Sequence, residues 1–205
     1  CRKCIVKINL GCDKLEKVQL NQRIIINSNL TLIPINRYDL EGIMEAIKEN
    51  SQDIVKAMPW LDINKNIKTQ ITTFVLESEI QNRAGEIHLW TIRNNLKNEF
   101  VGLVGVDKMT HQGGDWNFGY WIKKSFQKKG IASVALPNVI KWLSKHYNST
   151  CIEISVKPEN ISGLATCKHI LRTFNISNTE FKKTILNHNG EDRLYHTYII
   201  ELNDI

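Results

Sequence analysis

The sequence predicts a mixed α+β domain built around one central sheet. Three apolar, strand-like segments follow one another between residues 86 and 122, separated by the turn-forming pairs Asn94-Asn95 and Gly113-Gly114. Segments with apolar residues at helical spacing stand before and after this meander, and further strand-like segments lie towards both ends of the chain. The order of elements is therefore strand, helices, three-strand meander, helix, strand, helix and strands, which is typical of an α+β domain.

The segments before the meander predict strands and then helices. Arg23 to Ile35 is β-branched and apolar with a polar interruption at residues 27–29, so it predicts either two paired strands or one bent strand. Asn36 is placed to cap a helix whose apolar face is Leu40, Ile43, Met44 and Ile47. A short helix is expected through Ile54, Val55 and Met58, and a longer one from Ile63 to about Arg83.

The meander strands are expected at Glu86–Arg93, Glu99–Asp107 and Asp115–Ile122, and the segments after them continue the pattern. A helix with the face Ile131, Ala135, Val139 and Leu143 comes next, and Pro137 inside it predicts a kink, because proline removes a helical hydrogen bond at a cost of about 3 kcal/mol. The remaining expected elements are a strand at Thr150–Val156, a helix opened by Ile161, and a strand at Arg193–Leu202.

Composition limits the classes of protein to which this chain can belong. The 205 residues suit one domain, and the hydrophobic content of 42% and charged content of 23% are ordinary globular values. The longest apolar run, Phe100 to Val106, is too short to span a bilayer, and no secretory signal is recognised, so we expect no membrane contact and a cytoplasmic location. The net charge of +6 favours an anionic partner, which leaves nucleic acid, an acidic protein and a phosphate-bearing cofactor open. Because the lysines are scattered, nucleic acid is not expected.

Cysteine usage predicts neither a disulfide scaffold nor a metal site. Five cysteines is an odd number spread over a long chain. Cys1, Cys4 and Cys12 form a CxxC with a third thiol, but a closed zinc site needs a fourth ligand and no further Cys or His lies nearby in sequence. Free thiols in an N-terminal segment are expected.

Residues 119–132, GYWIKKSFQKKGIA, predict a place for an anion. A strand-like aromatic run leads through a basic turn to a helix start, where unpaired backbone N–H groups and the helix dipole attract negative charge. Gly130 lets the backbone approach a ligand closely, small Ala132 keeps that approach open, and Lys128 and Lys129 add positive charge. The spacing Q-x-x-G-x-A, from Gln127 onward, is not that of a Walker loop.

This stretch and its context resemble the GNAT acyltransferase superfamily, most closely its RimJ/RimL-like branch. The matching features are the strand end G-Y-W-I, the turn Q-x-x-G-x-A, Pro59-Trp60-Leu61, the V-G-L-V-G of residues 101–105, and Asn160. The resemblance covers about residues 23 to 202. Residues 1–20 fall outside it as an N-terminal extension of unknown role, with the GNAT-like domain at 21–205.

The resemblance implies a mostly antiparallel sheet, flanked by helices, that splays where acetyl-CoA binds. It places Tyr120, Trp121 and Ile122 along the pantetheine arm, and Asn160 where it helps to position that arm. A backbone N–H near Trp121 would stabilise the oxyanion. It places the pyrophosphate against the turn and helix start, at Gln127, Lys128, Lys129, Gly130, Ile131, Ala132 and Ser133.

Catalytic side chains depart from this family pattern. Where many relatives carry a tyrosine that protonates the thiolate, this chain has Cys167, which either takes that role or simply packs. Where RimL-like enzymes carry a serine, it has Gly163 with Ser162 beside it, and Thr184 aligns with their carboxylate, with Glu180 close by. Asp115 and Asn117 either relay a proton or form a polar sheet face. Trp60, His88 and Trp90 belong either to an acceptor cleft or to the edge of the core.

The function implied is that of an acetyl-CoA-dependent N-acetyltransferase acting by direct attack in a ternary complex, as a monomer or homodimer without metal. Its acceptor would be a protein N-terminal amine, such as that of a ribosomal protein, or a small-molecule amine. One alternative is a non-catalytic acyl-CoA-binding or sensor protein, because the serine and carboxylate are missing. Another, carried by net charge alone, is a nucleic-acid-binding module.

Overall fold

The computed structural model describes residues 22–49, 58, 60–147, 151–177, 180–188 and 190–201. The N-terminal extension with Cys1, Cys4 and Cys12, and the short helix expected through Ile54 and Val55, lie outside the described residues.

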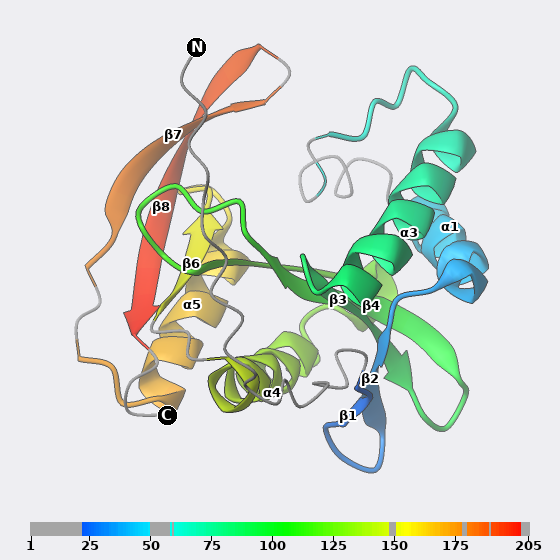
Figure 1. Cartoon of the computed structure of the whole chain (residues 1–205), viewed down its shortest axis with the longest axis horizontal. Coiled ribbons are helices and arrows are strands. Elements are labelled where there is room, and N and C mark those ends of the chain that lie inside the picture. Colours follow the sequence, from blue (N-terminus) through cyan, green and yellow to red (C-terminus); the bar gives the residue numbers. More distant parts are fainter. Residues whose placement is uncertain are drawn as a thin grey trace, which may run out of the picture.

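The described strands form one eight-stranded sheet in the order β1-β2-β3-β4-β5-β6-β8-β7 (Figure 1). Neighbouring strands are antiparallel except for β5 and β6, which are parallel. The predicted α+β class and mostly antiparallel sheet are therefore confirmed. The strands are β1 (Ile24–Ile25), β2 (Leu30–Pro34), β3 (His88–Asn94), β4 (Glu99–Asp107), β5 (Trp116–Ile122), β6 (Cys151–Val156), β7 (Lys182–His188) and β8 (Glu191–Glu201).

Two parts of the sheet were not settled by the sequence: the strands between Arg23 and Ile35, and β7. The segment from Arg23 to Ile35 is a pair of strands, because the Asn27 side chain accepts the N–H groups of Asn29 and Leu30, both at 2.9 Å, and closes a turn. Strand β7 was not predicted as a separate element. It pairs with β8 from Lys182 to His188 and forms the outer edge of the sheet.

Four helices lie in the described residues: α1 (Leu40–Glu49), α3 (Ile67–Ala84), α4 (Ile131–His146) and α5 (Ile161–Thr173). Asn36 is a cap as predicted, but of the short 3-10 turn η1 (Arg37–Asp39) that leads into α1. Helix α3 begins four residues later than predicted, because Asn66 caps it by accepting the N–H of Thr69 at 3.0 Å. Helix α4 runs from Ile131 to His146 through the buried Pro137 as one element.

Helices cover both faces of the sheet and divide the core in two. One cluster packs α4 and α5 against residues such as Trp90, Trp116 and Ile154, and the other packs α1 and α3 against Phe100, Leu103 and Trp121. Successive side chains of a strand point to opposite faces. On β5, Trp116, Phe118 and Ile122 therefore face α4 and α5, whereas Asn117, Gly119 and Trp121 face α1 and α3.

The sheet opens between β5 and β6. In the described part of the chain these strands pair at two positions, Trp116 with Ile152 and Asn117 with Glu153. Strand β5 stays paired with β4 as far as Ile122, and β6 stays paired with β8 as far as Val156. We call the gap between residues 118–122 of β5 and residues 154–156 of β6 the splay. The splayed sheet that the family resemblance implied is present.

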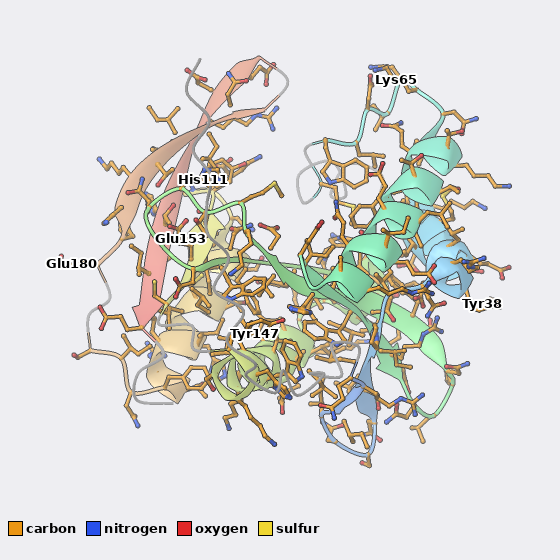
Figure 2. The ribbon with its side chains drawn as sticks, in the orientation of Figure 1. Tyr38, Lys65, His111, Tyr147, Glu153 and Glu180 are labelled. Atoms are coloured by element: carbon orange, nitrogen blue, oxygen red, sulfur yellow. The ribbon has the colours of Figure 1, made fainter. Side chains whose placement is uncertain are left out.

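A buried carboxylate holds the closed end of the splay. Glu153 is fully buried, and it accepts backbone N–H groups from His111 at 2.8 Å, Gln112 at 2.5 Å and Gly114 at 2.8 Å. Figure 2 shows the loop that carries His111 passing beside Glu153. A Cβ at Gly114 would lie 2.5 Å from Cγ of Glu153, so the loop approaches closely because this residue is glycine. Asp115 adds to the junction by accepting the N–H of Cys151 at 3.0 Å.

An aromatic cluster fills the core at the same end of β5, around Trp116. His88 lies among Trp90, Trp116, Trp142 and Tyr147, and its Nε2 is 2.5 Å from the Tyr147 hydroxyl. His88 and Trp90 are each 1% exposed, so both belong to the core and do not line a cleft. Burial lowers the pKa of His88 to about 4, and the positive charges of Lys108 and His146 act in the same direction.

The buried His88 predicts a loss of stability at mildly acidic pH. In the unfolded chain a histidine titrates near 6.5, so between pH 6.5 and 4 the unfolded state binds a proton that the folded state does not. The stability from neutral His88 is complete above pH 6.5 and should fall by about 2 kcal/mol at pH 5. Urea unfolding at pH 7.5 and 5.0 measures this loss, which should shrink in His88→Phe but persist in the exposed control His169→Gln. An equal pH 5 loss in wild type and His88→Phe would contradict the prediction.

Candidate active site

The turn between β5 and α4 has the geometry expected of an anion site. Strand β5 ends at Ile122, the 3-10 turn η2 (Lys124–Phe126) follows, and Gly130 stands immediately before α4 with a φ of 71°. No side chain among the described residues caps α4, which leaves its first N–H groups available. A Cβ on Gly130 would meet no atom within 4 Å, so the space above the turn is open.

The other turn residues shape this opening. The Gln127 amide donates to the carbonyl oxygen of Ile122 at 3.0 Å and so fixes the turn to the end of β5. Lys128 has a φ of 60°, which is rare for a residue with a side chain and reflects the tight turn. Lys128 and Lys129 are exposed, whereas Ile131 is anchored in the core and Ala132 and Ser133 are half-buried. The predicted residues 127–133 therefore come together at one helix N-terminus.

Tyr120, Trp121 and Ile122 lie in the part of β5 that no longer pairs with β6. Their partners on β4 are Val104, Leu103 and Gly102, and in the described residues no strand pairs with their other edge. A Cβ on Gly102 would lie 2.2 Å from the carbonyl oxygen of Trp121, so glycine is needed there for β5 to lie so close to β4. The free main-chain edge of β5 thus leads directly into the turn.

Helix α5 borders the splay from the other side. Asn160 caps it, because its Oδ1 accepts the N–H of Gly163 at 2.9 Å and the hydroxyl of Ser162 at 3.0 Å. A Cβ on Gly163 would lie 2.7 Å from Nδ2 of Asn160, which explains why glycine follows the cap here. Asn160 and Ser162 are both exposed, and a capping contact accounts for the Ser162 hydroxyl.

Cys167 lies further along α5 and is buried. Burial raises the pKa of its thiol to about 12, so the thiol is protonated at neutral pH. Burial also raises the pKa of the Tyr120 hydroxyl, and nearby Cys167 acts in the same direction. Tyr120 of β5 packs against the core cluster that contains Cys167 of α5, so both lie on the α4 and α5 face of the sheet.

Thr184 and Glu180 occupy different settings. Thr184 is buried in a chain of hydroxyl groups, where it accepts the Thr197 hydroxyl at 2.8 Å and the Gln112 amide at 3.0 Å. Thr197 is in turn 2.8 Å from the hydroxyl of Ser155, next to the splay. Glu180 lies at the outer edge of the molecule in Figure 2, away from the splay.

A buried lysine beside the turn was missed by sequence reasoning. The Nζ atom of Lys123 lies 3.2 Å from Glu49 at the end of α1 and 3.2 Å from Glu99 of β4. Glu49 also accepts the N–H of Ser125, a residue of η2, at 3.2 Å. The end of α1 is thereby attached to the segment that joins β5 to the turn. No pattern in the run KKSFQKK distinguishes Lys123 from its exposed neighbours.

The splayed sheet thus has a free strand edge that runs into a glycine turn at a helix N-terminus. A sequence model of the GNAT acetyltransferase domain matches residues 29–170, more than half of the 205 residues. The chain belongs to the GNAT acetyltransferase family. The resemblance seen in the sequence is thereby confirmed, and the chain is an N-acetyltransferase by family.

Solved structures share the fold of this GNAT chain. The ribosomal L7/L12 alpha-N-protein acetyltransferase RimL, in complex with coenzyme A, aligns with a TM-score of 0.73 at 15% identity, over 90% of this chain and 100% of RimL. The microcin C7 self-immunity acetyltransferase MccE, with acetyl-CoA and AMP, gives 0.69 at 21% identity, covering 86% and 94%. Spermidine N-acetyltransferase from Vibrio cholerae, with CoA and spermine, gives 0.65 at 17%, covering 87% and 98%. No curated protein sequence matches the chain.

Metal-binding clusters and membrane-spanning helices are both absent from the described residues. No group of three or more His, Cys, Asp or Glu side chains gathers there in a way that could hold a metal ion. None of the described helices combines the length and apolarity needed to cross a membrane.

Lys123 predicts a measurable effect on stability. Lys123→Met leaves the carboxylates of Glu49 and Glu99 facing each other without their shared cation. Because those side chains are about one third exposed, solvent reduces the cost to about 1–2 kcal/mol. Urea unfolding should show this loss, whereas the exposed control Lys97→Met should change little. Adding Glu49→Gln to Lys123→Met should recover part of the stability, and a Lys123→Met variant as stable as wild type would refute the prediction.

Proposed function

We propose that this chain transfers an acetyl group from acetyl-CoA to a primary amine. The observation that carries the proposal is the continuity between the free edge of β5 and the open turn at Gly130. A pantetheine arm carries amide groups that can pair with a strand edge, and a pyrophosphate suits a helix N-terminus. The strand edge and the helix N-terminus are adjacent here, in the order in which pantetheine and pyrophosphate occur along coenzyme A.

The residues present fit this ligand. N–H groups of Ile131, Ala132 and Ser133 are in the first turn of α4, where no side chain among the described residues competes for them. The exposed Lys128 and Lys129 add positive charge. Tyr120 and Ile122 offer main-chain groups toward the splay, with Trp121, whose carbonyl oxygen lies against Gly102 of β4, between them. Asn160 lies at the facing end of α5. Acetyl-CoA would supply the activated acyl group.

The chain would contribute mainly orientation and charge stabilisation. Holding an amine against a bound thioester supplies a large part of the rate through proximity. A backbone N–H near Trp121 would donate to the oxyanion that forms when the amine attacks. Cys167, which is protonated at neutral pH and next to Tyr120, is proposed to lie near the leaving thiolate. Ser162, occupied as part of the cap, has the weaker claim to a catalytic role.

The acceptor is proposed to be a protein N-terminal amine or a small-molecule amine. RimL acts on ribosomal L7/L12, and the spermidine enzyme acts on a polyamine, so the fold accommodates both kinds. The net charge of +6 would favour an acidic protein acceptor over a polycation. A cytoplasmic location and a monomeric or homodimeric state stay predictions, as does the assignment of 21–205 to one domain.

A second candidate is a non-catalytic acyl-CoA-binding protein. It is favoured by Thr184, whose hydroxyl is held in a buried chain where relatives carry a carboxylate. A panel of amines and peptides, with release of CoA as the readout, separates the two. Turnover of any acceptor supports the transferase, and CoA binding without turnover supports the binding protein.

Gly130 is predicted to be the residue that cofactor binding tolerates least. Its φ of 71° and the open space above it suit a close approach of the ligand, and a glutamate there brings both bulk and negative charge. Losing two amide contacts to a charged group, at about 1.5–3 kcal/mol each, weakens binding by two orders of magnitude or more. Lys128→Ala and Lys129→Ala should cost far less, because exposed charges are screened.

Calorimetry with CoA measures these affinities, and circular dichroism confirms that each variant is folded. A folded Gly130→Glu variant that binds CoA as tightly as wild type would remove the main support for the acetyltransferase proposal.

Cys167 is predicted to tune turnover without governing cofactor affinity. Cys167→Ala should bind CoA as wild type does and turn over more slowly, because a proton donor near the thiolate is lost. Burial keeps the pKa of the thiol at about 12, so the pH dependence of turnover between pH 6 and 9 should keep its shape. An unchanged rate in Cys167→Ala would show that the thiol only packs. Cys167→Ser, which replaces the thiol by another proton donor of similar size, is the matched control.

A further inference from the structure

We propose that Asp107 accepts the proton lost by the amine during acetyl transfer, and that Asn117 holds its carboxylate in position. This inference rests on the proposed function, because it takes the thioester to lie along β5. It concerns residues at the far end of the meander from the anion turn. Asp107 ends β4, and its partner in the sheet register is Asn117 of β5.

The two faces of the sheet have different tasks in this arrangement. The anion turn belongs to α4, which packs on the face that Trp116, Phe118 and Ile122 share with α5. A cofactor bound there approaches the splay from that face, so the amine must arrive from the face of α1 and α3. Asn117 and Gly119 point to this second face, on the same side as Trp121.

Gly119 marks an open place on that face. It is exposed, and a Cβ added to it would meet no atom within 4 Å. It stands between Asn117 and the buried Trp121 on the part of β5 that has left β6. An amine above Gly119 would therefore face a thioester held along the free edge of β5.

The carboxylate of Asp107 lies on the same face of the sheet as the open position at Gly119 and is close to it. The Asn117 amide nitrogen is 3.2 Å from Oδ1 and 3.3 Å from Oδ2 of Asp107, and the N–H of Met109 donates to Oδ1 at 2.8 Å. Oδ1 thus has two donors, whereas Oδ2 shares one and keeps capacity to accept a further proton. Asp107 is the diagonal neighbour of Gly119 across the β4–β5 ladder, a separation of about 7–8 Å that the carboxylate side chain and one water molecule can bridge.

Other carboxylates near the splay are committed to structure. Glu153, the register neighbour of Asn117 on β6, is fully buried and holds three backbone N–H groups. Asp115 accepts the N–H of Cys151, and Glu49 pairs with Lys123. Asp107 differs from these carboxylates. It is half-buried, and although an amide and a backbone N–H hold its side chain, Oδ2 keeps capacity to accept a proton.

The neutral amine attacks the thioester carbonyl carbon, the C–N bond forms, and the C–S bond breaks to release the thiolate. The proton lost from nitrogen passes through a water to Oδ2 of Asp107 and from there to solvent. The thiolate takes one proton, so amine and acetyl-CoA give the acetamide and CoA thiol.

Asp107→Asn tests the proposal with little risk to the fold. The asparagine oxygen can accept from Met109 and Asn117 as Oδ1 does now, so the charge and the proton-accepting oxygen are removed while the contacts persist. CoA affinity should stay within twofold of wild type, and kcat/KM for the amine should fall about 100-fold or more. Asn117→Ala, which frees the carboxylate, should lower kcat about tenfold, and Asp107→Glu should restore part of the activity.

Asp192→Asn is the matched control, because Asp192 also accepts an asparagine amide, that of Asn187 at 2.8 Å, but at the exposed β7–β8 hairpin. It should retain wild-type turnover. An Asp107→Asn variant that turns over within threefold of wild type overturns this inference and leaves the proposed function intact. Wild-type protein that binds CoA but acetylates no amine overturns both, and a lack of CoA binding by wild type overturns the proposed function at its first step. A misfolded Asp107→Asn is replaced by Asn117→Ala, whose unchanged kcat would equally overturn the inference.

Discussion

The early end of the pairing between β5 and β6 is the constraint on which the rest of the molecule depends. Two register pairs hold the strands together, and beyond them each strand keeps its partner on one side only among the described residues. Had the ladder continued to Ile122, the main-chain groups facing β6 would be occupied and no edge would be left to pair with a ligand. The Glu153 contacts and the Asp115 contact to Cys151 are grouped at the closed end, where they stop the strands from separating altogether.

The opening gives the two helical layers separate roles. Helices α4 and α5 border the splay with the glycine turn, Asn160 and Cys167, while α1 and α3 cover the opposite face with Trp121, Phe100 and Leu103. Lys123 spans the boundary, because its ammonium joins α1 to the segment that leads into the turn. The ion pairs of Lys123 therefore attach α1 to the turn next to the proposed cofactor site.

The sequence was informative where structure depends on neighbours in the chain. The turn at 127–133 was predictable, because a strand end, a glycine with positive φ and an uncapped helix start are consecutive. The α+β class followed from segment order for the same reason. Strand β7 was missed, because its stability comes from β8 and the sheet edge and its own residues are largely exposed.

Contacts between distant segments could not be read from the sequence. The Lys123 ion pairs depend on where α1 ends against β4 and η2, and the contact of Asp107 with Asn117 depends on strand register. His88 and Trp90 also illustrate the limit, since the same residue types would suit a cleft or a core. The packing of α4 against His88 and Trp90 places both side chains in the core.

The unpaired edges of the splay also bear on the lifetime of the protein in a cell. A ligand that pairs with them binds the folded chain and not the unfolded one, so it stabilises the fold by mass action, by about 2.7 kcal/mol at a hundred times its dissociation constant. A protein with two incomplete internal edges would then be more easily degraded when its cofactor is scarce. Through the proposed site, the abundance of this acetyltransferase would follow the supply of its acyl donor.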